Sequence, residues 1–412
     1  MQFNQIIAQQ PTKNKLIDLV QNNRLSHALL FLGKEGNGAL PLAIAFAQYI
    51  LCEKANPNSK ANNATSLFDN LETLASAVNL EDSCGQCASC TKVNQLIHPD
   101  LHFSYPALKR DSKHDRVLST DYITEWREFI EQTPYNNVAD WINFLKENSK
   151  SKIEAPANKQ GNITVFECDD ISHKLSLKSF ESSYKILIMW MPEFLGNSGN
   201  KLLKLIEEPP DNTIFIFVAE DESAILPTIL SRTQLIKIPS LSNPDIEKAL
   251  ITRYQLSQEK ASQIAVVSEG NYRDALYLLQ DSGEDLQLQV RGWLNVILKN
   301  EINGQIKWIE EISKIGREKQ KQFLKYFIHL IEQTIRVQYL DEDSLDSIPE
   351  NERDFALRLS KMCSLEAQEA ITKELGRAIY HIERNAHAKM LFHALTIRFL
   401  HIIKDNSLIL VE

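Results

Sequence analysis

Short apolar runs alternate with helical patterns over the first 240 residues of the chain. The run at 27–32 ends at a glycine, and a glycine-rich turn leads into an apolar helical stretch over 39–51. Four further runs have the length of strands: 163–166, 185–190, 213–218 and 234–238. Helical patterns separate most of them, at about 170–180, 198–208 and 223–230. Near-continuous apolar strands that alternate with helices predict an α/β fold with a parallel sheet covered on both faces.

Only helical patterns follow Pro239. Asn243 before Pro244 is typical of a helix N-cap with proline at the first helical position. Three short helices are expected, over 244–254, 258–268 and 272–280. The pattern from about 285 to 408 is helical throughout, with few glycines or prolines. We therefore expect a small helical domain and then a larger all-helical domain, with a boundary near 282.

Two stretches interrupt the α/β pattern. Residues 53–83 are rich in Asn, Ser and Ala with little periodicity, which is typical of an insertion. Residues 104–160 form a second irregular stretch, which ends in an expected loop from 149 on. It carries four aromatic residues on expected helices: Trp126, Phe129, Trp141 and Phe144. Such side chains could stack on nucleic-acid bases, but their acidic neighbours and helical spacing favour packing within the protein.

The charge balance argues against autonomous DNA binding. The chain has 45 Lys and Arg against 54 Asp and Glu, a net charge of −9, whereas tight binding to the DNA backbone needs clustered positive charge. Contact through a local basic face or within a complex remains open.

No apolar run reaches the roughly 18 residues of a membrane span. No basic segment followed by an apolar core opens the chain, so we expect a cytoplasmic protein.

Three of the six cysteines crowd together as Cys84-x-x-Cys87-x-x-Cys90. In a chain without a secretory signal, this clustering favours a metal site over disulfides. A structural Zn²⁺ site is tetrahedral and needs a fourth ligand. Cys168 and Cys363 are expected to be buried thiols.

The glycine-rich turn has the spacing of a phosphate-binding loop without its working residues. A functional P-loop reads G-x-x-x-x-G-K-[ST], where the lysine meets the β- and γ-phosphates and the hydroxyl binds Mg²⁺. Here Gly33, Gly36 and Gly38 are followed by Ala39 at the lysine position and Leu40 at the hydroxyl position. Productive ATP binding is therefore not expected. The alternative is that these glycines form only a tight turn between a strand and a helix.

A second ATPase element is also altered. ATPases carry acids after an apolar strand, which hold Mg²⁺ and orient water. The strand expected at 185–190 has this character, but Trp190 and Met191 occupy the positions of the acids. Two independent losses at one site agree in predicting that the chain has no ATPase activity of its own.

Several motifs occur in a characteristic order: Arg24-Leu-Ser-His27-Ala, the glycine loop, the cysteine cluster, His98-Pro99-Asp100, Asn200-Lys-Leu-Leu-Lys-Leu-Ile-Glu-Glu208-Pro209-Pro210, and Leu226-Pro-Thr-Ile-Leu-Ser231-Arg232-Thr233. Together they resemble the subunits of the bacterial DNA polymerase III clamp loader. The resemblance covers about 1–100 and 160–280, whereas 281–412 match only in helical character. Within that family, gamma/tau subunits keep the P-loop lysine and the acids, and the delta prime type, which this chain resembles, lacks a working site.

The resemblance implies three domains. A RecA-like AAA+ α/β domain with a parallel sheet would occupy 1–240, including a zinc module at 52–90 and the insertions 53–83 and 104–160. A small helical lid domain would follow at 241–282, and an all-α collar domain at 283–412 would join five subunits into a ring.

The implied function is that of a non-hydrolysing subunit in ATP-driven loading of the sliding clamp onto primed DNA. Its partners would be gamma/tau and delta subunits in the five-membered ring, the clamp, and primed DNA through the complex, with no membrane partner. Two alternatives remain: an active gamma/tau-like AAA+ ATPase with an atypical site, and a DNA-binding adaptor.

The resemblance also assigns roles to single residues. Arg232 matches the arginine of the family's Ser-Arg-Cys motif, although Thr233 replaces the cysteine. It would be an arginine finger that acts in trans on a neighbour's ATP; the alternative is a surface arginine that caps the preceding helix. Arg273 matches a sensor arginine and, with no nucleotide to sense, is expected to pack the lid against the core.

The family places its first zinc cysteine at the end of the helix after the glycine loop, where Cys52 stands. Structural Zn²⁺ held by Cys52, Cys84, Cys87 and Cys90 is therefore implied. The long insertion between Cys52 and Cys84 can loop out because closure cost grows slowly with length. His98 is the competing fourth ligand.

Overall fold

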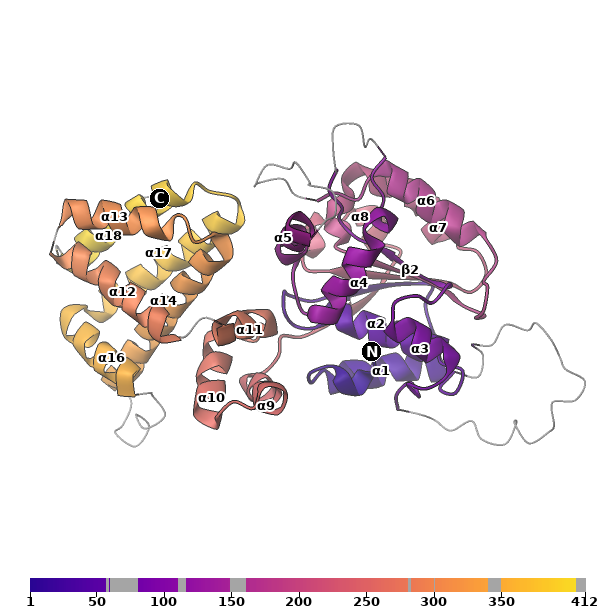
Figure 1. The fold of residues 1–412 in the computed structure, drawn as a ribbon, viewed down its shortest axis with the longest axis horizontal. Helices are drawn as coiled ribbons and strands as arrows, with labels where there is room; N and C mark the ends of the chain where they lie inside the picture. Colours follow the sequence, from indigo (N-terminus) through magenta and orange to yellow (C-terminus); the bar gives the residue numbers. More distant parts are fainter. Residues whose placement is uncertain are drawn as a thin grey trace, which may run out of the picture. The chain divides into compact units, whose positions relative to one another are not determined.

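The computed structural model describes residues 1–56, 59, 81–109, 116–148, 161–280, 283–299, 301–339 and 350–404. It forms two compact units, residues 1–273 and 274–412 (Figure 1). Most of the expected insertion 53–83 and most of the expected loop over 149–162 lie outside the described residues.

The first unit is built on a sheet of five parallel strands in the order β2-β3-β4-β1-β5. The strands are β1 (Ala28–Leu32), β2 (Leu101–Ser104), β3 (Lys185–Trp190), β4 (Thr213–Ala219) and β5 (Gln234–Lys237). In the register, Leu30 pairs with Phe217 on one side and with Leu235 on the other. Strands β3 and β4 are buried along their whole length, as expected for a parallel sheet with both faces covered. The predicted α/β fold is confirmed.

Alternate residues of each strand enter two separate cores, because successive side chains point to opposite faces of a sheet. Leu29 and Phe31 pack with the helices of the first core, and Ala28 and Leu30 pack with those of the second. The first core includes residues of α1 (Gln10–Gln21), α2 (Ala39–Leu51), α3 (Ala88–Asn94), α4 (Ile123–Gln132) and α5 (Val138–Asn148). The second includes residues of α6 (Val165–Ser176), η5 (Pro192–Leu202), α7 (Leu203–Glu207) and α8 (Pro227–Leu230).

The strand expected at 163–166 is wrong. Val165 and Phe166 open helix α6, and Thr164 caps it by accepting the Glu167 N–H at 3.3 Å. An apolar run of four residues cannot distinguish a strand from the first turn of a helix, and the capping threonine decides for the helix. The sheet takes β2 instead, from the end of the stretch that precedes the second insertion.

The helices expected to carry the four aromatic residues are present as α4 and α5, and these aromatic side chains are buried. Trp126, Phe129 and Trp141 are at most 1% exposed. The Trp126 ring stacks on Tyr105 with centroids 4.0 Å apart. These side chains are therefore core residues, and base stacking by them is excluded.

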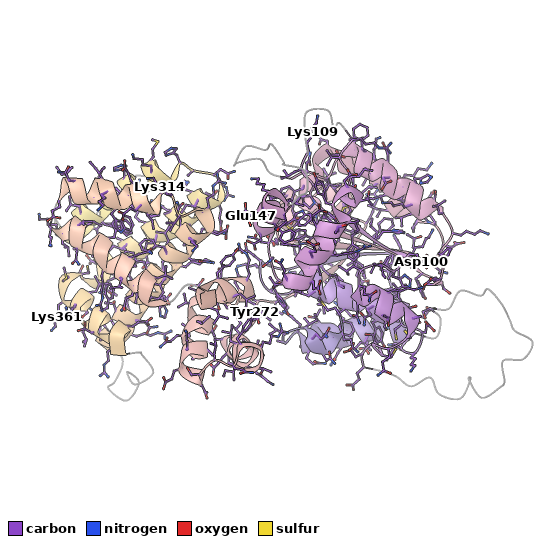
Figure 2. The ribbon with its side chains drawn as sticks, in the orientation of Figure 1. Asp100, Lys109, Glu147, Tyr272, Lys314 and Lys361 are labelled. Carbon is purple, nitrogen blue, oxygen red and sulfur yellow. The ribbon has the colours of Figure 1, made fainter. Side chains whose placement is uncertain are left out.

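The remaining helices of the first unit's described residues are η1 (Phe3–Gln5), η4 (Ser119–Tyr122), η6 (Glu222–Ala224), α9 (Asn243–Tyr254) and α10 (Gln258–Val267). Helix α11 (Tyr272–Gln280) begins in the first unit and continues into the second. The three helices predicted after Pro239 are confirmed within a residue or two at their ends. The N-cap of α9 is Ser242, not Asn243, because the Ser242 hydroxyl accepts the Asp245 N–H. Tyr272, labelled in Figure 2, is buried and packs edge-on against Tyr135 with centroids 4.9 Å apart.

Helices are the secondary-structure elements among the described residues of the second unit, as expected. It consists of α12 (Gly283–Leu298), α13 (Ile302–Ile312), α14 (Arg317–Tyr339), α16 (Glu350–Met362), α17 (Leu365–Glu383) and α18 (Ala388–Lys404), together with the end of α11. Trp293 lies at the centre of its core, stacked on Trp308 at 4.7 Å, and its indole N–H donates to Thr396. Among the helices of the described part of the chain, none is long and apolar enough to span a membrane.

Candidate functional site

The glycine loop connects β1 to α2 and requires glycine at two positions. Gly36 and Gly38 have φ of +72° and +93°, in the left-handed region that favours glycine. A Cβ on Gly38 would lie 2.9 Å from Cε1 of Tyr135. The sequence therefore predicted correctly that these glycines shape a tight turn between a strand and a helix.

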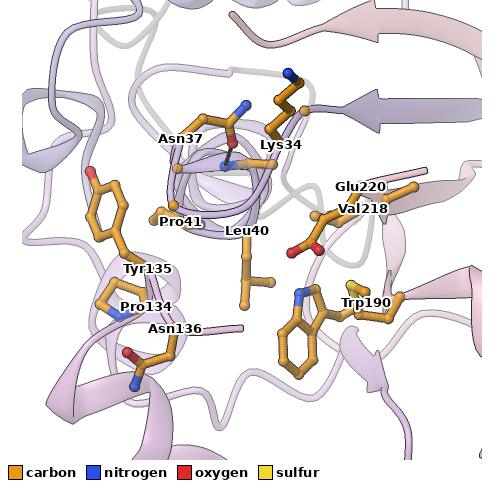
Figure 3. A pocket seen from close by; sticks show the side chains of 16 residues that line it. Lys34, Asn37, Leu40, Pro41, Pro134, Tyr135, Asn136, Trp190, Val218 and Glu220 are labelled. Atoms are coloured by element: carbon orange, nitrogen blue, oxygen red, sulfur yellow. Dashed lines mark hydrogen bonds between the residues drawn. The ribbon is translucent and has the colours of Figure 1, made fainter. Parts of the chain in front are cut away.

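The amide that opens α2 is satisfied within the loop. Asn37 is buried, and its Oδ1 accepts the Ala39 N–H at 3.1 Å, the bond drawn in Figure 3. Its Nδ2 donates to the Ile238 carbonyl at 2.7 Å. In a phosphate-binding loop such amides point at the ligand. Here the first one is held by a side chain of the same loop.

Large apolar side chains occupy part of the hollow beside the glycine loop. Leu40 extends from α2 into the space between Tyr135 and Trp190 (Figure 3). Leu40, Trp190 and Met191 are all buried. The volume of this hollow is about 20 Å³, which is room for roughly one water molecule. Among the described residues that line it, Lys34 and Glu220 are the charged ones.

The end of β3 contributes packing side chains. The Trp190 ring lies 5.3 Å from Trp126 and 6.2 Å from Phe129, centroid to centroid. Glu193 follows shortly after in the sequence, but its Oε1 accepts the N–H groups of Glu220 and Asp221 at 2.6 and 3.0 Å. Burial raises the pKa of Glu193. Its carboxylate thus holds the loop after β4 and is not among the groups lining the hollow.

Arg273 is a buried structural residue, as expected. Its Nε and Nη2 donate to the two carboxylate oxygens of Asp140 on α5, at 2.5 and 2.7 Å. Its Nη1 donates to Glu35 of the glycine loop at 2.6 Å. The neighbouring Tyr272 N–H donates to the Gly36 carbonyl at 3.1 Å. The start of α11 is therefore bonded to both the loop and α5.

Arg232 stands at the surface between α8 and β5, with about a third of its side chain exposed (34%). Its Nε donates to Glu207 Oε1 at 2.6 Å, and its Nη1 donates to the Thr228 carbonyl at 2.8 Å. The bond to Thr228 is the helix-capping contact of the simpler interpretation. The bond to Glu207 was not anticipated: the two residues lie 25 positions apart, and no sequence pattern pairs them.

The structure gathers Cys52, Cys84, Cys87 and Cys90 into one cluster whose Sγ atoms all lie within 4.8 Å of one another. The Sγ atoms of Cys84 and Cys90 are 3.9 Å apart, close to the edge of about 3.8 Å of a tetrahedron with Zn–S bonds of 2.3 Å. Cys52 comes from the end of α2 and Cys87 caps α3. The four sulfurs fit a tetrahedral metal ion, so this cluster can hold one.

Backbone donors and a neighbouring thiol favour a thiolate in the cluster. Cys52 Sγ accepts the N–H groups of Ala55 and Cys84 at 3.4 and 3.3 Å. A hydrogen bond from the Cys90 thiol, together with these amides, lowers the pKa of Cys52 to about 5. The same bond, with burial, raises the pKa of Cys90. A sulfur site with negative charge and aligned donors suits a soft or borderline cation.

His98 lies outside this cluster. It is buried, and its Nδ1 accepts the Asp100 N–H at 3.2 Å. Asp100 in turn accepts the N–H groups of Phe180 and Glu181. The structure thus brings Cys52, and not the competing histidine, to the three clustered cysteines. Cys168 and Cys363 are buried thiols, as expected.

Comparison with known proteins identifies the family. The family model described as "DNA polymerase III, delta subunit" matches residues 8–72 and 60–242, which together span more than half of the chain. The chain belongs to this family. The expected resemblance to clamp-loader subunits of DNA polymerase III is confirmed.

Two relatives are named as other subunits of DNA polymerase III. DNA polymerase III subunit delta prime of Bacillus subtilis is 24% identical over 244 residues, covering 59% of this chain and 51% of the relative. Subunit tau of the same organism is 24% identical over 296 residues, covering 70% of this chain and 39% of the relative. The chain thus spans about half or less of the length of these relatives. A solved gamma subunit-related protein from Thermotoga maritima aligns over 95% of this chain and 99% of its own, at 11% identity and a TM-score of 0.35, too low to add to the argument.

Proposed function

We propose that this chain is a non-hydrolysing clamp-loader subunit of the delta prime type, which helps to load the sliding clamp onto primed DNA. The observation that carries the proposal is a contrast between two surfaces. Leu40 and Trp190 fill the chain's own nucleotide position, while Arg232 keeps a partly exposed guanidinium elsewhere. One half of an ATPase interface is lost and the other half is retained.

The filled hollow supports the absence of intrinsic ATPase activity. ATP hydrolysis needs a lysine on the phosphates, a hydroxyl and an acid on Mg²⁺, and a positioned water. This chain offers Ala39, Leu40, Trp190 and Met191 at those positions. The Ala39 amide is also engaged by Asn37. Binding of ATP in a productive geometry would have to displace core packing.

The retained arginine supports a role in trans. A guanidinium that reaches a neighbour's γ-phosphate stabilises the charge of the transition state, an effect worth roughly 10³–10⁵ in rate in well-studied hydrolases. Arg232 would supply this group to a neighbouring gamma/tau subunit in a five-membered ring that also holds delta. Contact with the clamp and with primed DNA would come through the complex in the cytoplasm, in line with the chain's net charge of −9.

We further propose that the cysteine cluster holds structural Zn²⁺. Four protein sulfurs close the coordination sphere and leave no position for a reacting water, so the ion would supply folding energy and no chemistry. Cys52, Cys84, Cys87 and Cys90 would tie the end of α2 to the start of α3.

The domain division that follows from the family is also a proposal: a RecA-like AAA+ domain over 1–240, a lid over 241–282 and an oligomerising collar over 283–412. The contacts of Arg273 with Glu35 and Asp140 support a lid fixed to the AAA+ domain.

The test is reconstitution with candidate ATPase subunits, clamp and primed DNA. Wild-type chain should raise the stimulated ATPase rate, Arg232→Ala should lower it at least tenfold, and Arg232→Lys should not restore it because a lysine lacks the planar fork. Lys204→Ala, which removes an exposed positive charge from nearby α7, is the matched control. An unchanged rate with Arg232→Ala contradicts the role in trans, and ATP turnover by the isolated chain contradicts the non-hydrolysing assignment.

A further inference from the structure

Glu207 and Arg232 form an ion pair between two helical segments that the chain places side by side. Glu207 is the last residue of α7, and Arg232 follows α8 by two positions. Both Nε and Nη2 of the arginine contact Glu207 Oε1. The Nη1 atom contacts the Thr228 carbonyl at 2.8 Å and the Ser231 hydroxyl at 3.1 Å.

These contacts fix the guanidinium on three of its sides. An arginine side chain has five N–H donors in a rigid planar fork, and here Nε, Nη1 and Nη2 all have acceptors from the same small region of the chain. The plane of the fork is thereby set before any neighbouring subunit arrives. About a third of the side chain (34%) stays open to solvent.

The pair is poorly suited to a purely stabilising role. The Glu207 and Arg232 side chains are 44% and 34% exposed, and ion pairs at such exposed positions contribute little to folding because water screens them. A long arginine side chain loses considerable rotamer freedom when it is held against a ligand. A partner that holds it in place beforehand removes that cost from the step in which it acts.

We propose that Glu207 is a positioning residue for Arg232, which orders the guanidinium for contact with phosphate on a neighbouring subunit. This inference rests on the proposed function in trans. Glu207 acts through its Oε1 acceptor and touches no reacting atom. Glu208, adjacent and also exposed, makes no side-chain hydrogen bond or ion pair with the described residues.

The experiment measures the stimulated ATPase of the reconstituted loader with Glu207→Ala, Glu207→Gln and the matched control Glu208→Ala. We expect Glu207→Ala to lower kcat on the order of tenfold, below the roughly hundredfold loss that a 1 Å misplacement can cause, with KM for ATP nearly unchanged. Glu207→Gln keeps an oxygen acceptor and should retain most of the rate. Glu208→Ala should behave as wild type. Combining Glu207→Ala with Arg232→Ala should give the loss of Arg232→Ala alone, because the two act as one unit.

The outcomes separate the two proposals. If Arg232→Ala lowers the rate and Glu207→Ala does not, the positioning role is wrong and the function in trans stands. If Arg232→Ala has no effect, the function in trans fails and the positioning role fails with it. Equal losses for Glu207→Gln and Glu207→Ala overturn positioning through the acceptor. The melting temperature of the chain should differ by no more than about 2 °C between these variants. The proposal is overturned if Glu207→Ala lowers the melting temperature strongly and its loss of rate is fully explained by the fraction of unfolded chain.

Discussion

Replacement of Arg273 by alanine should unfold the first unit at a much lower denaturant concentration. Arg273 is fully buried, and Asp140, which it contacts through two N–H groups, is only 7% exposed. Removing the arginine leaves the carboxylates of Asp140 and Glu35 without this cation. Breaking a buried ion pair by deleting one partner costs about 3–5 kcal/mol, a large part of the 5–15 kcal/mol that holds a typical domain folded.

This loss can be measured on the unit that contains the pair. The five tryptophans divide between the units: Trp126, Trp141 and Trp190 in the first, Trp293 and Trp308 in the second. In a background with phenylalanine at the two positions of the second unit, fluorescence reports the first unit alone. With a urea slope of about 3 kcal/mol/M, the midpoint should fall by about 1–1.7 M.

The control and the refuting result are direct. Lys260→Ala removes an exposed positive charge from α10 in the same unit and should change stability by about 0.5 kcal/mol or less. A double-mutant cycle with Asp140→Ala should give a coupling energy of about 1–3 kcal/mol. A midpoint shift for Arg273→Ala no larger than that of Lys260→Ala would refute the conclusion that the arginine locks α11 onto the loop.

Three further predictions concern the hollow, the cysteines and a buried acid. The double substitution Ala39→Lys with Leu40→Thr should not confer ATP hydrolysis, because Trp190 still offers no metal ligand; turnover in a phosphate-release assay would contradict this. Purified chain should contain about one Zn²⁺, and Cys84→Ser should lower both the metal content and the melting temperature; metal content well below one per chain would count against the site. Burial raises the pKa of Glu193 above its ordinary 4.5, so the folded state binds the proton more tightly and stability should fall as pH rises from 4.5 through that raised pKa. Glu193→Gln should flatten this slope in unfolding titrations, and an unchanged slope would show that another group causes it.

Much of the fold followed from pattern alone. The strands β1, β3 and β4 are mostly apolar, and such runs between helices are typical of a buried parallel sheet. Strand β5 gave a weaker signal, because Gln234 and Lys237 flank its two apolar residues. Strand β2 was missed because it is only four residues long and begins Leu-His, which interrupts the apolar run. The capping role of Thr164 was missed because the two apolar residues after it resembled the rest of a strand.

Part of the candidate site could likewise be predicted from the sequence, and part could not. Local signals located the glycine loop and the three clustered cysteines, because each motif lies within a few consecutive residues. Partners brought together by the tertiary fold left no local signal. Glu207 with Arg232 and Asp140 with Arg273 are separated by 25 and 133 positions, and no single-sequence pattern constrains such pairs. The bond from the Ala39 amide to Asn37 depends on a loop conformation that the residue types allow but do not dictate.

The packing around the hollow would make the proposed loss of the nucleotide site hard to reverse in evolution. Leu40 and Trp190 are now part of a continuous core, at 4% and 3% exposure. Replacing a buried leucine or tryptophan by a smaller residue typically costs about 2–5 kcal/mol, and an acid at position 190 would also need its charge satisfied. Building a nucleotide site here would require several destabilising changes before any binding advantage appeared, and most natural proteins lie too close to their stability threshold to tolerate them. On the proposed function, the side chains that fill the hollow therefore stabilise the fold in the form that does not bind nucleotide.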